Sequence, residues 1–126
     1  MLQQAIPTIR VDSAAAARAF FEPLGFAQIF EGSASDDPYK PDPCFMGFQR
    51  DEVVIHASSH SGDGAGGAVI YILVDDVDAL HAEFVAKGVS IDTGPIDQDW
   101  GVREMYVKDS QNNALRFAQP LDPDEG

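Results

Sequence analysis

Two stretches of this chain, Ile9–Gly25 (IRVDSAAAARAFFEPLG) and Ile72–Gly88 (ILVDDVDALHAEFVAKG), are copies of one pattern. At a fixed offset of 63 residues they share seven identities in seventeen positions, without a gap. Each copy has an apolar strand, an aspartate suited to cap a helix (Asp12, Asp75), an alanine- and phenylalanine-bearing helical stripe, and a final glycine suited to end that helix. The pattern therefore predicts one structural unit that occurs twice.

Strand-like segments follow each helix and complete a βαβββ unit. The predicted strands are 6–11, 26–31, 45–49 and 53–57 in the first copy, and 69–74, 89–93, 103–108 and 114–119 in the second. The turn at 109–113 contains Asn112 and Asn113, and either can adopt a positive φ. We predict an α+β fold in which module 1 (5–57), a glycine-rich linker (58–67) and module 2 (68–120) form a single domain, with an acidic tail at 121–126.

The charge of the chain is strongly acidic. Twenty-one acidic residues against eight basic ones give a net charge of −13. Such a surface repels nucleic-acid phosphates and anionic membranes and attracts cations, so neither nucleic acid nor membrane is an expected partner. The same charge can also serve solubility alone. A single cysteine, Cys44, excludes an internal disulfide, and no secretory leader is evident at residues 1–4, so we expect a cytoplasmic protein.

One segment of the second copy carries a more specific signal. The stretch Trp100–Asp109 (WGVREMYVKD), followed by Leu115-Arg116-Phe117, resembles the vicinal oxygen chelate superfamily, which includes glyoxalase I and the bleomycin resistance proteins. The paired βαβββ pattern agrees, and the resemblance spans residues 6–119. It implies curved mixed sheets with a concave cavity. For the bleomycin-resistance branch it also implies a homodimer, in which an N-terminal strand is often exchanged, that sequesters a cationic antibiotic without modifying it.

The resemblance also implies four positions where enzymes of the superfamily hold a divalent metal. In this chain they are Ala5, His56, Val69 and Arg116. Alanine and valine offer no ligand atom, and a guanidinium has no lone pair for a cation. His56 alone can ligate, whereas catalytic metal sites commonly use three protein ligands. The residues therefore favour a protein with no metal, no cofactor and no catalytic residue.

Alternation along the strands predicts which side chains face the cavity. Residues 55, 57, 105, 107, 115 and 117 are assigned to the core, and their neighbours to the opposite face. Trp100 is expected at the rim, in a polar loop with Asp97, Gln98 and Asp99, where an exposed indole suits a flat cation. The resemblance assigns a drug-stacking role to Trp100. The predicted ligand-binding residues are Trp100, Glu104, Tyr106, His56, Arg116, Tyr71, Tyr39 and Phe45.

These observations lead to one functional hypothesis and two alternatives. The hypothesis is a metal-free, dimeric binding protein that confers resistance by sequestering a cationic antibiotic of the bleomycin type. The first alternative is a binder of another small molecule. The second is a metal-dependent lyase, isomerase or dioxygenase of the same superfamily. Cys44 belongs to none of them, because no basic partner stands near it in the sequence to activate its thiol.

Overall fold

The computed structural model describes residues 1–33, 35–37 and 39–122. Within these residues the elements are β1 (Thr8–Arg10), α1 (Ala14–Phe21), β2 (Ala27–Ser33), β3 (Cys44–Arg50), β4 (Val53–Ser58), β5 (Val69–Leu73), α2 (Val77–Ala86), β6 (Thr93–Gln98), β7 (Val102–Lys108) and β8 (Ala114–Pro120). Neither of the described helices has the length and apolar character needed to cross a membrane.

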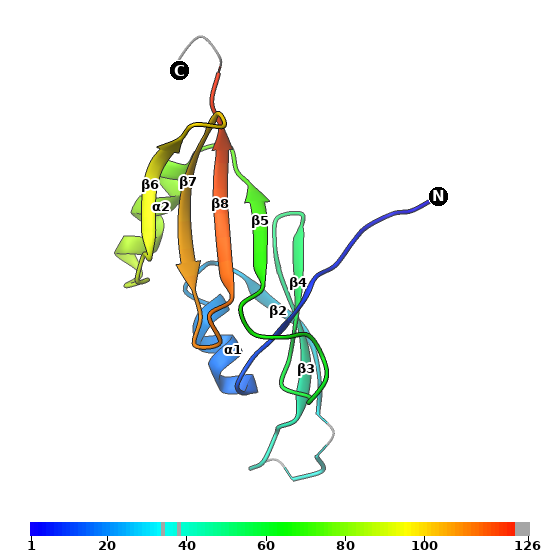
Figure 1. Cartoon of the computed structure of the whole chain (residues 1–126). Coiled ribbons are helices and arrows are strands. Elements are labelled where there is room, and N and C mark those ends of the chain that lie inside the picture. The colour runs from blue at the N-terminus through cyan, green and yellow to red at the C-terminus, as the bar shows by residue number, and fades with distance from the viewer. Residues whose placement is uncertain (34, 38, 123–126) are drawn as a thin grey trace. The chain divides into compact units, whose positions relative to one another are not determined.

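The strands form two four-stranded mixed sheets with the same internal order. One sheet runs β1-β4-β3-β2 and the other β5-β8-β7-β6. In each, the first strand pairs in parallel with the fourth, and the remaining neighbours are antiparallel. Figure 1 shows the four strands of the second sheet side by side in this order. The predicted duplication and the α+β class are confirmed.

Two compact units result from this arrangement. Unit 1 consists of Met1–Ala68 with Ser110–Asn113, and unit 2 of Val69–Asp109 with the residues from Ala114 onward. The turn between β7 and β8 therefore belongs to unit 1. Whether both units act as one domain with the predicted boundaries stays a prediction. The tail residues 123–126 lie outside the described residues.

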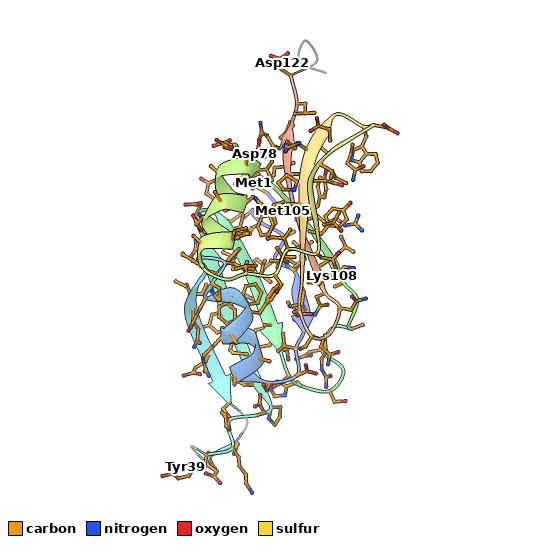
Figure 2. All side chains as sticks on the ribbon, turned by 90° about the vertical axis from the view of Figure 1, so that its left-hand side faces the viewer. Met1, Tyr39, Asp78, Met105, Lys108 and Asp122 are labelled. Atoms are coloured by element: carbon orange, nitrogen blue, oxygen red, sulfur yellow. The ribbon has the colours of Figure 1, made fainter. Side chains whose placement is uncertain are left out.

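Each unit packs its helix on one face of its sheet. In unit 1, Phe21 of α1 stacks on Phe48 of β3, with ring centroids 4.5 Å apart. In unit 2, Phe84 of α2 meets Phe117 of β8 edge to face at 5.3 Å. The fully buried Met105, labelled in Figure 2, is the residue of β7 that pairs with Phe117. The core residues predicted from alternation are confirmed, because all six are at most 3% exposed: 55, 57, 105, 107, 115 and 117.

Both helices begin one residue later than the sequence predicts. The N-caps are Ser13 and Asp76, whose side chains each accept a hydrogen bond of 3.0 Å from the backbone N–H three residues on. The prediction of Asp12 and Asp75 as N-caps was wrong, because the residue after each of them can also cap a helix and does so here. The expected helix end is confirmed at Gly88, which follows the C-cap Lys87 of α2 and has φ of +79°. In α1 the C-cap is Glu22, and Gly25, with φ of +81°, lies three residues further on, in the turn that leads to β2.

The prediction for β6 was wrong. The strand is Thr93–Gln98, not 89–93, so Asp97 and Gln98 lie in a strand and not in the loop around Trp100. The residues Gly94 and Pro95 are unusual in a strand, so the local sequence does not predict one here. The strand β6 nevertheless tolerates the proline, because it lies at the edge of its sheet and its register shifts between Thr93 and Ile96. Gly94 is required there, because a Cβ would lie 2.4 Å from the Glu104 carbonyl oxygen.

Candidate ligand-binding site

Four of the predicted ligand-binding residues come together on the sheet of unit 2. Tyr106 of β7 pairs with Arg116 of β8, which in turn pairs with Tyr71 of β5. Directly paired residues project from the same face of a sheet, so these three side chains form a row across three strands. Glu104 precedes Tyr106 by two positions and shares that face, which is opposite to the one that Met105 packs under α2.

Glu104 is the centre of this group. Its side chain is fully buried, which is unusual for a carboxylate without a paired cation. Oε1 accepts hydrogen bonds from the Tyr106 hydroxyl at 2.6 Å and from Gln98 Nε2 at 3.0 Å. Oε2 has no hydrogen-bond partner among the described residues. The carboxylate is thus held through Oε1, and Oε2 is enclosed by the surrounding side chains.

Arg116 lies on the other side of Tyr106. Its guanidinium carbon is 4.6 Å from the centroid of the Tyr106 ring, a distance typical of a cation–π contact. The Nε atom is buried and, within the part of the chain that the structure describes, makes no hydrogen bond. Tyr106 therefore serves both neighbours, with its hydroxyl on Glu104 and its ring face against Arg116.

Trp100 lies in the turn between β6 and β7 and is 63% exposed. Gly101 has φ of +85°, and its N–H donates to the Gln98 carbonyl at 3.2 Å, which closes the turn tightly and leaves the indole outside it. The Tyr71 hydroxyl is a hydrogen-bonding neighbour of both the Trp100 side chain and Glu104. The expected position just before a strand is confirmed, and the indole borders the row on β5, β8 and β7.

The two tyrosines of the site are held in their neutral form. The hydrogen bond to Glu104, followed by burial, raises the pKa of Tyr106. Burial is the main cause that raises the pKa of Tyr71; the contact with Trp100 lowers it, and Glu104 raises it further. Both phenols therefore stay protonated at neutral pH and remain hydrogen-bond donors.

A second group of predicted residues lies on the sheet of unit 1. Phe45 of β3 and His56 of β4 meet edge to face at 5.2 Å. Phe30 of β2, which the sequence analysis missed, stacks on Phe45 at 5.9 Å and meets His56 at 5.1 Å. The one available signal was Gly47 inside β3, because a Cβ there would lie 2.3 Å from the Phe30 ring. The three rings form an aromatic cluster with Phe30 40% exposed.

Tyr39 does not join that cluster. It lies in the loop between β2 and β3 and is 91% exposed, so its ring packs on none of the described residues. Its backbone N–H donates to Asp37 Oδ1 at 2.9 Å, a contact within the loop. Figure 2 shows Tyr39 at the tip of this loop. A role in lining a site stays a prediction for this residue.

The positions implied for a metal do not form a suitable donor set. In the register of β1 and β4, the residue opposite His56 is Thr8, and Ala5 lies before the strand. In unit 2, Tyr71 is opposite Arg116, and Val69 is opposite Ala114. Among the described residues there is no group of three or more His, Cys, Asp or Glu side chains that could hold a metal ion. The side chains at these positions do not fit a divalent metal.

Cys44 is likewise unsuited to nucleophilic chemistry. The residue is fully buried at the start of β3, and burial raises the pKa of its thiol. A raised pKa leaves little thiolate at neutral pH, and the thiolate is the reactive form. The interpretation of Cys44 as a structural thiol agrees with this environment.

Comparisons with known proteins agree with the fold. A family model described as "Glyoxalase superfamily protein" matches residues 1–124. A search of curated proteins finds no match. The chain is similar to a bleomycin-binding protein solved in complex with bleomycin, at 22% identity and a TM-score of 0.72, over 94% of this chain and 98% of the other.

Two further solved structures show the same likeness. A bleomycin resistance determinant encoded on the transposon Tn5 is 23% identical, with a TM-score of 0.73, over 94% of this chain and 98% of the other. A glyoxalase/bleomycin resistance protein from Streptomyces sp. CB03234 is 20% identical, with a TM-score of 0.68, over 93% of this chain and 100% of the other. At these identities the likeness concerns the fold.

Proposed function

We propose that this chain, which belongs to the glyoxalase superfamily, is a binding protein that sequesters a cationic antibiotic of the bleomycin type without modifying it. Two solved structures of similar fold are a bleomycin-binding protein in complex with bleomycin and a bleomycin resistance determinant. Those names describe the other proteins. For this chain the proposal rests on the side chains of unit 2.

The observation that carries the proposal is the combination of an exposed indole, in the turn between β6 and β7, with a buried carboxylate on β7. Trp100 offers an open aromatic face, and a flat or cationic group can stack on it. Glu104 adds a buried carboxylate beside it, whose negative charge attracts a cation. A flat cationic ligand can stack on the indole and also gain from the negative charge of the carboxylate, whereas a purely apolar ligand would gain only the stacking.

The charge of the chain supports the same ligand class. A net charge of −13 produces a negative potential that attracts cations and raises their rate of encounter. This long-range attraction is screened by salt, whereas stacking on Trp100 is not. Binding of a cationic drug is therefore expected to weaken, but not to vanish, when the ionic strength rises.

A fluorescence titration tests the proposal. Trp100 is the only tryptophan of the chain, so its emission reports on the site alone. We expect metal-free and copper-loaded bleomycin to quench this emission in a saturable way at micromolar drug. Glu52→Gln, an isosteric change of an exposed acid in the turn between β3 and β4, serves as the control and should give the same curve. An emission unaffected by micromolar drug would rule the proposal out.

Recovery of the drug separates sequestration from catalysis. After incubation with the protein and release by denaturation, the bleomycin should have an unchanged mass and unchanged DNA-cleaving activity. A new mass that depends on the protein would instead support an enzyme of the same superfamily. The residues at the implied metal positions favour the first result, because Ala5, Val69 and Arg116 are not metal ligands.

We also propose that the protein acts as a homodimer. The strand β5 is an edge strand of its sheet. It exposes three apolar side chains on one face: Val69 at 52%, Tyr71 at 47% and Leu73 at 67%. A row of apolar side chains along an edge strand is a favourable surface for a second copy, because association removes it from water.

A further inference from the structure

We infer that Tyr71 is a positioning residue for Trp100: its hydroxyl accepts a hydrogen bond from the indole N–H and donates one to Glu104, and so holds the exposed ring in one orientation for stacking. The inference concerns the site of the proposed function and rests on that function for the ligand that the ring meets. It gives Tyr71 a role that involves no contact with the ligand. The hold on the ring exists in the free protein, where it can be measured without any drug.

The backbone at Trp100 is fixed, but its side chain has little support from packing. The Gly101 N–H donates to the Gln98 carbonyl at 3.2 Å, and the Gly101 carbonyl accepts from the Leu121 N–H at 2.9 Å. These bonds hold the turn, whereas the indole is 63% exposed. An exposed side chain usually changes rotamer within nanoseconds. A stacking surface with a single orientation therefore needs a further contact.

The register of the sheet lets Tyr71 supply this contact. Figure 1 shows β8 between β5 and β7, so a side chain of β5 must cross β8 to reach Glu104. The residue on its way is Ala118, which pairs with Glu104 on one side and with Leu73 on the other. The small, fully buried side chain of Ala118 leaves room for the Tyr71 ring, which can lean along the strand toward β7. The hydroxyl of Tyr71 thereby lies next to both Glu104 and Trp100.

The chemistry of the three polar groups allows only one order of hydrogen bonds. An indole N–H is a donor only, and a carboxylate is an acceptor only. A phenol hydroxyl is both, so it accepts from Trp100 and donates to Glu104. Burial is the main cause that raises the pKa of Tyr71. Beyond burial, Trp100 lowers this pKa and Glu104 raises it, as expected for a hydroxyl that accepts from the first residue and donates to the second.

The buried end of this chain of hydrogen bonds is held in place. Glu104 is fully buried, and its Oε1 accepts from the Tyr106 hydroxyl at 2.6 Å and from Gln98 Nε2 at 3.0 Å. The orientation of the exposed indole is thus tied to the buried part of the sheet. A ring that is ordered before the ligand arrives loses less entropy on binding. Tyr71 therefore increases the affinity without touching the ligand.

The free protein gives the first test, because Trp100 is its only tryptophan. Tyr71→Phe keeps the ring and removes the hydroxyl. In this variant we expect the indole N–H of Trp100 to exchange with water about ten-fold faster, a factor that corresponds to one net hydrogen bond. The time-resolved fluorescence anisotropy of Trp100 should show faster local motion. Tyr39→Phe, the same substitution at a 91% exposed position, is the matched control and should change neither readout.

A second measurement tests the same hydrogen bond with Tyr71 left intact. Replacement of Trp100 by 3-benzothienylalanine keeps the shape of the ring and exchanges the N–H group for sulfur, at a position exposed enough to tolerate it. After burial, the contact with Trp100 is the next influence on the pKa of Tyr71, and it lowers that pKa. The pKa of Tyr71 should therefore be higher in this variant. An NMR titration of the tyrosine Cζ signals measures it, and Tyr39 should titrate as in the natural protein.

Drug binding distinguishes positioning from direct contact. In calorimetric titrations, Tyr71→Phe should weaken the binding of metal-free bleomycin by about five-fold, which corresponds to the ordering of one side chain. In a Trp100→Ala background, Tyr71→Phe should have no further effect, because no ring remains to be positioned. An equal effect in both backgrounds would mean that Tyr71 contacts the drug itself, and it would overturn the inference.

Unchanged exchange and anisotropy of Trp100 in Tyr71→Phe would also overturn the inference, and so would an unchanged pKa of Tyr71 in the benzothienylalanine variant. Failure of the proposed function looks different. There, bleomycin does not bind, although the indole is ordered in the natural protein and mobile in Tyr71→Phe. Conversely, saturable bleomycin binding with an indole that is equally mobile in both proteins would retain the proposed function and remove the role of Tyr71.

Discussion

At the residue scale, Tyr106 is the side chain on which the order of the site depends. It donates to Glu104 Oε1 and supports the Arg116 guanidinium on its ring. Without its hydroxyl, Glu104 would lose the shortest of its hydrogen bonds and keep Gln98 and the Tyr71 hydroxyl as neighbours. A buried carboxylate that loses a donor destabilises the folded state. The site therefore depends on a phenol that contacts both charged groups.

We predict that Tyr106→Phe lowers the free energy of unfolding by about 1 kcal/mol at neutral pH, because one hydrogen bond to a carboxylate is lost and the ring is kept. Urea denaturation measures the change. Tyr39→Phe, the same substitution at a 91% exposed position, is the matched control and should have no effect. An equal loss in both variants would contradict the assigned role of the hydroxyl.

The hydrogen bond between Tyr106 and Glu104 should also make the stability of the protein depend on pH. Glu104 and burial raise the pKa of Tyr106 in the folded protein above the value of about 10 for an unfolded tyrosine. The stability that its neutral hydroxyl contributes is therefore complete below pH of about 10 and is lost as the pH rises through the folded value. The difference between the natural protein and Tyr106→Phe should shrink in alkaline urea titrations. A constant difference would contradict this coupling.

At the element scale, the turn between β7 and β8 is held in place by the side chain of Asp12. Asp12 follows β1, and its carboxylate accepts hydrogen bonds from the side chains of Ser110 and Gln111. Asn113 of the same turn donates to the Arg10 carbonyl at 2.7 Å. These contacts tie the turn at 110–113 to the end of β1 within unit 1. The carboxylate of Asp12 therefore stabilises this turn and does not cap α1.

We predict that Asp12→Ala lowers the stability of the protein at neutral pH. The hydrogen bonds from Ser110 and Gln111 lower the pKa of Asp12 below its ordinary value of 3.8. The stability that the ionised Asp12 carboxylate contributes is therefore complete above a pH of about 3.8, and it is lost as the pH falls through the lowered pKa of Asp12 in the folded protein. Thermal melts across this range should show the variant and the natural protein converging in acid. Asp99→Ala, at an exposed position in the turn of Trp100, is the control; a difference that persists in acid would refute the coupling.

The elements that could be predicted from the sequence are those with a strong local pattern. In β7 the apolar pair Met105 and Val107 marks the core face, so Glu104 and Tyr106 were assigned correctly to the opposite face. The strand β6 has no such pattern, because Gly94 and Pro95 interrupt it and its residues are mostly polar. Its position depends on pairing with β7, which is a tertiary contact. Local signals cannot supply that information.

The candidate site was predictable in part for the same reason. Alternation placed Glu104, Tyr106 and Arg116 on one face, and register then brought Tyr71 beside them. Gln98 was assigned to a loop, so its hydrogen bond to Glu104 was not foreseen. Phe30 was missed because a bulge between Gln28 and Phe30 changes the face to which the rest of β2 points. Side chains that depend on register or on a bulge are not predictable from spacing alone.

At the scale of the whole molecule, the proposed dimer makes a direct prediction. Leu73 on the edge strand β5 is 67% exposed, and a charge at this position would oppose burial against a second copy. We predict that Leu73→Lys shifts the protein from dimer to monomer in sedimentation-velocity runs. Val85→Lys, a matched change at a 54% exposed apolar residue on α2, should leave the dimer intact. A natural protein that sediments as a monomer would refute the dimer.

The central claim is that this chain holds a cationic antibiotic through Trp100 and the carboxylate of Glu104. Isothermal titration calorimetry of the full chain with metal-free bleomycin tests it most directly, because the heat does not depend on the fluorescence of Trp100. We predict saturable binding at micromolar drug or below, weaker at high salt. In Trp100→Ala the affinity should fall about ten-fold or more. The absence of binding heat at two temperatures, or equal affinities in the natural protein and Trp100→Ala, would contradict the account.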